Sequence, residues 1–250
     1  MNSNGTNTGR SSRLVFSCGA KGGVGKSTVM VGLTEYYHAK EVPVELLDLD
    51  NENESKGSLK GWFPSATKID MRKANAYDIL LRKAFQSECD VVLADLAAAQ
   101  GQRVWDWFGT IYESALAAGL AVRFTAVAVV TNDPASVEGV LQWGNHLRDR
   151  VEYLIVLNQM TPDDTFRTWH RSPAVQEFCS RYRPKQIHIA ARDVDFQHVT
   201  REHGLTLSAL ASGLNTEDEQ LADPVLRVRA FGYRKELFDQ LVDVAEVLLP

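Results

Sequence analysis

A glycine-rich segment near the N-terminus, 18–28 (CGAKGGVGKST), contains the residue types that bind phosphate groups. Glycines allow the backbone to turn tightly beside an anion, and successive N–H groups of such a turn point toward it. Lys26 offers a cation to the β- and γ-phosphates of a nucleotide, and the Ser27 hydroxyl offers a ligand to Mg²⁺. The residues expected to cradle the phosphates are Gly22, Gly23, Val24, Gly25, Lys26, Ser27 and Thr28.

Acidic residues further along the chain are candidates for the metal and for catalysis. Asp48 and Asp50 close one apolar run, and Asp95 closes another. A carboxylate at the end of a buried strand can hold Mg²⁺ through a water molecule. Asp90 begins its strand, and we therefore expect it at the opposite end from this site.

The elements around the glycine-rich segment are those that a phosphate-binding loop needs. Residues 14–17 form an apolar run typical of a buried strand, and residues 28–39 follow a helical pattern. Strand and helix patterns then alternate, which predicts an α/β fold with a doubly wound, mostly parallel sheet and helices on both faces. Ligands of such sheets bind beyond the carboxyl ends of the strands, so the loop, Asp50 and Asp95 are expected on one rim.

The last predicted helix could either pack against the domain or lie on a membrane surface, and the charge of its polar face distinguishes the two. Its second half, after an expected break at Gly232, has an apolar stripe and an acidic face. A helix on a membrane surface needs a basic polar face, so we expect packing against the domain and no membrane contact. The expected strands after the glycine-rich loop are 42–50, 90–95, 124–131, 153–157 and 186–190. The expected helices are 76–88, 104–118, 135–150, 173–182 and 225–249. A loop is expected within 59–69.

The composition is that of a globular protein kept in a reducing compartment. Of 250 residues, 44% are apolar and 24% are charged, and the net charge of −5 gives no overall basic signature for nucleic acid. Three scattered cysteines without a C-x-x-C motif argue against disulfides and fit a cytoplasmic location. We expect a disordered tail over 1–12, without a signal peptide, and a single domain over 13–250.

The glycine-rich segment departs from the common pattern G-x-x-x-x-G-K-[ST], because Ala20 stands where that pattern begins with glycine. It matches the variant K-G-G-x-G-K-[ST], whose additional lysine is Lys21. The chain thereby resembles the ParA/MinD superfamily of P-loop ATPases, which carry this deviant Walker A motif on a SIMIBI-type P-loop NTPase fold. The resemblance implies ATP and Mg²⁺ as cofactors, an ATP-dependent homodimer, and contact of Lys21 with the phosphates bound by the other subunit.

The resemblance also implies roles for the polar residues at the strand ends. Asp50 stands where relatives have an acid that orients the attacking water and contacts the metal shell, and Asp95 stands at the Walker B position. Asn158 follows a strand where relatives have an asparagine on the adenine edge, and an amide suits this role because it both donates and accepts. The resemblance thus assigns catalysis to Lys21, Lys26 and Asp50, and metal binding to Ser27, Asp50 and Asp95.

One departure separates the chain from standard chromosome-partitioning members of the superfamily. The D-x-D pair is usually followed by Pro-Gln, whereas Asn51 and Glu52 follow it here. Together with the small residues after Asp95 and the pattern of residues 221–241, this departure resembles the TraL/MobD branch, which comprises accessory ATPases of plasmid conjugation and mobilisation.

These features predict a Mg²⁺-ATP-dependent dimerising ATPase, slow unless a partner stimulates it. It would act as a switch in positioning, in plasmid partition or mobilisation, or in the assembly of a partner complex, so a protein partner or cargo adaptor is expected. Two alternatives are a small-molecule kinase, in which Lys21 would have no role, and a module that binds nucleotide without hydrolysis. A third is a partition ATPase that binds DNA non-specifically through Arg181, Arg183, Lys185 and Arg192.

Overall fold

The computed structural model describes residues 12–50, 57–73, 75–119, 122–213 and 221–250. The expected tail up to residue 11 and the pair Asn51 and Glu52 lie outside the described residues. Ser12, which the sequence places in the tail, is instead the first residue of the first strand.

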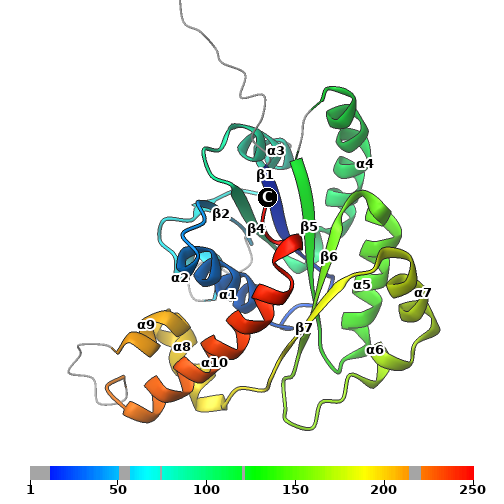
Figure 1. Ribbon diagram of the computed structural model, residues 1–250. Helices are drawn as coiled ribbons and strands as arrows, with labels where there is room; N and C mark the ends of the chain where they lie inside the picture. The colour runs from blue at the N-terminus through cyan, green and yellow to red at the C-terminus, as the bar shows by residue number, and fades with distance from the viewer. Residues whose placement is uncertain (1–11, 51–56, 74, 120–121, 214–220) are drawn as a thin grey trace, which may run out of the picture.

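The described residues form a seven-stranded sheet in which all paired strands are parallel, so the predicted fold is confirmed (Figure 1). The spatial order is β3-β2-β4-β1-β5-β6-β7. The strands are β1 (Ser12–Cys18), β2 (Val44–Leu49), β3 (Thr67–Lys68), β4 (Val91–Leu96), β5 (Val122–Val130), β6 (Glu152–Asn158) and β7 (Lys185–Ile189). Strands β2, β3 and β4 lie on one side of β1 and strands β5, β6 and β7 lie on the other, so the chain changes direction across the sheet beside β1. The carboxyl end of β1 is thus at the switch point at which such sheets bind ligands.

Helices cover both faces of the sheet, as predicted, because each buried strand presents alternate side chains to opposite sides (Figure 1). Leu14 and Phe16 pack with one layer of helices, and Val15 between them packs with the other. The first layer contains α3 (Ala76–Gln86), α4 (Gly101–Ala117), α5 (Pro134–Leu147), α6 (Arg167–Arg171) and α7 (Pro173–Tyr182). The second contains α1 (Lys26–Ala39), α2 (Leu59–Trp62), α8 (Val194–His203), α9 (Leu207–Ser212) and α10 (Pro224–Asp243).

Two details differ from the sequence prediction. The segment 59–69 contains, beside the expected loop at Phe63 and Pro64, the short helix α2 and the two-residue edge strand β3. The expected break at Gly232 is wrong, since α10 continues through it and ends at Asp243, followed by a 3₁₀ turn, Ala245–Val247. Glycine costs a helix only about 1 kcal/mol, and the buried residues Ala230 and Leu237 hold α10 against the domain on either side of it.

The predicted packing of the C-terminal stripe is confirmed, because Leu237, Leu241 and Leu248 are buried in the second layer. Among the helices that the structure describes, none is long and apolar enough to cross a membrane.

Arg13 ties the C-terminal turn to the centre of the sheet, a contact that the sequence did not reveal. Its side chain is 0% exposed and lies on β1. The guanidinium donates to Thr125 Oγ1 at 2.6 Å and to the Glu152 carboxylate at 2.6 Å. It also donates to the backbone carbonyls of Glu246, Val247 and Leu249. These bonds compensate the desolvation of the buried cation and hold the turn after α10 in place.

We expect Arg13→Met to lower the free energy of unfolding by about 1–3 kcal/mol, because it leaves the Leu249 carbonyl without its donor and removes one of the two arginines that pair with Glu152. Urea denaturation followed by circular dichroism measures this loss. Arg123 is a matched control, since it pairs with the same Glu152 from an exposed position. Arg123→Met should cost less than about 1 kcal/mol. Equal losses in the two variants would show that burial of Arg13 is not the source of the effect.

Candidate functional site

The phosphate-binding loop joins β1 to α1 at the carboxyl end of the central strand. Gly23 and Gly25 have φ angles of 76° and 98°, in the left-handed region that side chains disfavour. A Cβ atom on Gly25 would also lie 2.7 Å from Asn158 Nδ2. The loop therefore requires glycine at position 25 both for its conformation and for the close approach of Asn158.

Asn158, the last residue of β6, is fixed against this loop. Its Nδ2 donates to the Val24 carbonyl at 2.9 Å. The Val24 side chain is itself buried, so this residue contributes its backbone to the site. The bond uses one amide proton of Asn158 and leaves its Oδ1 as an acceptor. A role for Asn158 at the base of a nucleotide stays a prediction.

The two lysines of the loop occupy different places. Lys26 is buried at the first position of α1, where the helix dipole favours an anion, and its Nζ donates to the Lys21 carbonyl at 2.9 Å. Lys21 is exposed and does not line the cavity at the loop. Its Nζ forms an ion pair of 3.1 Å with Asp133, whose carboxylate also caps α5.

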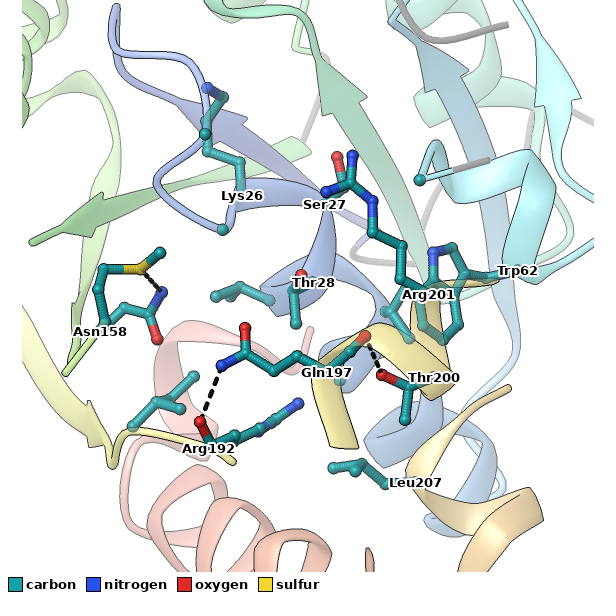
Figure 2. A pocket seen from close by; sticks show the side chains of 18 of the residues that line it. Lys26, Ser27, Thr28, Trp62, Asn158, Arg192, Gln197, Thr200, Arg201 and Leu207 are labelled. Atoms are coloured by element: carbon teal, nitrogen blue, oxygen red, sulfur yellow. Dashed lines mark hydrogen bonds between the residues drawn. The ribbon is translucent and has the colours of Figure 1, made fainter. Parts of the chain in front are cut away.

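A cavity of about 470 Å³ extends from the phosphate-binding loop along α1 to α8 and α9 (Figure 2). The structure thus brings together most of the predicted site residues, which lie at or just after the carboxyl ends of β1, β2 and β6. The cavity is lined by Gly22, Gly23, Gly25, Lys26, Ser27, Thr28, Asp50 and Asn158 from the predicted set. Lys21, Val24 and Asp95 of that set do not line it.

Asp95 is the penultimate residue of β4, next to Leu96, which lines the cavity, and one of its carboxylate oxygens is unused. Its side chain is fully buried; Oδ1 accepts from the Ser17 hydroxyl at 2.8 Å, whereas Oδ2 has no hydrogen-bond partner among the described residues. Burial raises the pKa of Asp95 to about 6, and the Ser27 and Ser17 hydroxyls partly oppose this shift. Asp48 and Asp50 add to the rise in its pKa because like charges disfavour ionisation.

These residues fit a magnesium ion. A buried carboxylate oxygen without a donor, beside a serine hydroxyl at the start of the loop helix, is the donor set that holds Mg²⁺ next to phosphates and water. No cluster of three or more His, Cys, Asp or Glu side chains suited to a metal occurs in the part of the chain that the structure describes. The site would therefore depend on the nucleotide for its remaining ligands.

The two acids of the D-x-D pair have different surroundings. Asp48 is 0% exposed; it accepts hydrogen bonds from the Asp50 and Lys60 backbone N–H groups and pairs with Lys68 at 3.2 Å. Asp50 lines the cavity. Asp48 thus joins the end of β2 to Lys60 and Lys68, and Asp50 is the member of the pair that lines the cavity.

One wall of the cavity comes from α8, α9 and the segment before them, which the sequence analysis did not connect to the site. Arg192, Gln197, Arg201 and Leu207 lie along this wall (Figure 2). Glu35 of α1 holds the wall in place, since its carboxylate accepts from the backbone N–H groups at the start of α9. The four wall residues of α8, α9 and the preceding segment lie more than 150 positions after the loop in sequence. No local sequence pattern indicates that they contact the same cavity.

Three of the four basic residues considered for DNA binding have separate partners in the structure. Lys185 pairs with Glu246 at 2.5 Å, and the Arg181 guanidinium lies over the Tyr182 ring. Arg192 lies over the Tyr233 ring and lines the cavity. DNA binding by this segment stays a prediction.

No family model and no curated protein matches the sequence. Solved structures do match the fold. The MinD cell division protein of Aquifex aeolicus is 14% identical, with 96% of this chain and 99% of that chain covered and a TM-score of 0.51. The MinC:MinD cell division protein complex of the same organism is 13% identical over 96% and 98% of the two chains, with a TM-score of 0.54. The chain therefore has the P-loop NTPase fold seen in MinD, and at this identity the likeness extends to the fold alone.

Proposed function

We propose that this protein is a Mg²⁺-dependent ATPase that works as a nucleotide switch on a protein partner. The observation that carries the proposal is the cavity at the end of β1. Its phosphate-binding glycines, Lys26 and Ser27 lie on one rim with Asp50, and the buried Asp95 carboxylate interacts with the Ser27 hydroxyl. Plasmid partition or mobilisation is the setting proposed from the resemblance to the ParA/MinD superfamily and its TraL/MobD branch.

Each residue of the rim has a distinct role in this proposal. The loop N–H groups and Lys26 bind the β- and γ-phosphates and compensate the charge that develops on the terminal phosphate. Ser27, Asp95 and Asp50 would hold Mg²⁺, which, when bound, neutralises phosphate charge as a Lewis acid. Asp50 orients the attacking water, and Asn158 binds the base.

Lys21 supports the second part of the proposal, assembly controlled by nucleotide. It is exposed and outside the cavity, and its ion pair within the described ranges is with Asp133 at the surface. An exposed ion pair contributes only about 0–1 kcal/mol, so the lysine can leave Asp133 at little cost. In an ATP-bound homodimer Lys21 would contact the phosphates of the other subunit, and hydrolysis would remove that contact. The neighbouring solved structure that includes MinC is itself a complex between two proteins.

We expect Asp50→Ala to bind ATP and to release phosphate at least about 10-fold more slowly than the wild type, because water is no longer oriented. Incubation with ATP labelled in the terminal phosphate, followed by product separation, measures this rate. Asp106→Ala is the matched control, since Asp106 is exposed on α4 outside the cavity.

The same assay separates the proposed ATPase from its alternatives. Label in free phosphate indicates a hydrolase, and label in an added acceptor indicates a kinase. ATP bound without any product indicates a module that only binds nucleotide. Unchanged hydrolysis by Asp50→Ala would contradict the role given to Asp50.

A further inference from the structure

Arg201 on α8 is a cation at the phosphate site that the roles above do not use. Its side chain extends from α8 across the cavity toward Ser27 (Figure 2). The guanidinium also lies beside Gly57, where an added Cβ would be 3.4 Å from Nε and Nη2. Gly57 follows the segment that begins after Asp50. Arg201 therefore lies between Gly57 and the start of α1 at Ser27.

The position of Arg201 is fixed by its helix, whereas no carboxylate of the described residues pairs with its guanidinium. Phe196, Val199 and Thr200 are buried and pack α8 against the second layer. In the part of the chain that the structure describes, Arg201 forms no ion pair and is among the exposed residues. An anion that enters the cavity could thus bind the Arg201 guanidinium without breaking an ion pair to a carboxylate of the described residues.

The order of residues across the cavity indicates which part of a nucleotide Arg201 would meet. Figure 2 shows Asn158 and Arg201 on opposite sides of Ser27 and Thr28. If the base lies at Asn158 and the β- and γ-phosphates lie at Lys26 and Ser27, the chain of phosphates ends on the side of Arg201. A guanidinium binds phosphate oxygens with two parallel N–H bonds, which an exposed arginine can form without changing its charge state.

We propose that Arg201 binds the terminal phosphate of a nucleoside triphosphate from within the same subunit and thereby distinguishes triphosphate from diphosphate. This inference rests on the proposed nucleotide-binding function and adds a residue to it. The helix α8 is then part of the nucleotide site, and its contact with the terminal phosphate is lost when that phosphate leaves.

Calorimetric titration of Arg201→Gln with a non-hydrolysable ATP analogue and with ADP, both with Mg²⁺, tests the inference. We expect about a tenfold loss of affinity for the ATP analogue, or about 1.4 kcal/mol, and less than about a twofold loss for ADP. Arg82→Gln is the matched control, since Arg82 is an exposed arginine on α3 outside the cavity, and it should bind both nucleotides like the wild type.

The outcomes separate this inference from the proposed function. A wild-type protein that binds neither nucleotide overturns both. A wild type that binds nucleotide, with Arg201→Gln unchanged or equally weakened toward ATP analogue and ADP, overturns the inference alone. If Arg201→Gln does not fold, as judged by its thermal melt, Arg201→Lys decides instead. It keeps the charge and loses the forked geometry, so about a threefold loss specific to the ATP analogue is expected, and no loss overturns the inference.

Discussion

Lys26→Ala is expected to weaken ATP binding by about 100-fold or more, equivalent to roughly 3 kcal/mol, because it removes the buried cation that contacts two phosphates. Lys26 is the first residue of α1, its side chain is held against the loop, and it lines the cavity. Its loss leaves the negative charge of the nucleotide to the loop N–H groups and the helix dipole, which contribute less than a fixed charge. Isothermal titration calorimetry with ATP and Mg²⁺ gives the affinity directly.

The control for Lys26→Ala is a lysine outside the site. Lys73 is exposed and does not line the cavity, so Lys73→Ala should bind ATP with wild-type affinity. Both variants should melt close to the wild-type temperature in the absence of nucleotide. Tight ATP binding by Lys26→Ala would contradict the assignment of the glycine-rich segment as the phosphate site.

Asp95→Asn is expected to abolish the effect of Mg²⁺ on nucleotide binding and to slow phosphate release by about 100-fold or more. The change retains the shape of the side chain and an acceptor for the Ser17 hydroxyl, and it removes the charge of the unpartnered oxygen. Because burial already disfavours the carboxylate and raises its pKa to about 6, the neutral amide relieves a cost of folding at neutral pH. The free energy of unfolding without Mg²⁺ should therefore not decrease at neutral pH.

The control for Asp95→Asn comes from the same region of the sheet. Asp90 immediately precedes β4 at the end opposite to Asp95, and Asp90→Asn should retain the response to Mg²⁺. Titrations with ATP in Mg²⁺ and in EDTA measure the response of each variant. A large Mg²⁺ effect that persists in Asp95→Asn, or one that is lost equally in Asp90→Asn, would place the metal elsewhere.

The sequence predicts the centre of the site because its signals are local. The glycine spacing, Lys26 and Ser27 lie within one short segment between a strand and a helix, and the fold confirms that context. Asp50 and Asp95 follow apolar strands, and parallel strands bring their carboxyl ends to one rim. The main strands and helices follow from the same periodic patterns, which depend on which face each residue buries.

The parts that the sequence did not predict depend on contacts between distant segments. Arg13 looks like an ordinary charged residue before a strand, and only the folded chain shows that it is buried beneath the C-terminal turn. Arg201 reaches the site because α8, far from the loop in sequence, lines the same cavity as α1. Asp48 and Asp50 are alike by type and spacing, and only burial and hydrogen bonding distinguish the structural acid from the one that lines the cavity.

The central claim, that bound nucleotide controls assembly through Lys21, is tested most directly by light scattering on Asp50→Ala. The monomer has a mass of 27.8 kDa. We expect a mass near this value with ADP and roughly twice this mass with ATP and Mg²⁺. The additional change Lys21→Ala should restore the monomer mass in ATP while leaving ATP binding intact. The same mass with ATP and with ADP, or an ATP dimer that persists without Lys21, would contradict the account.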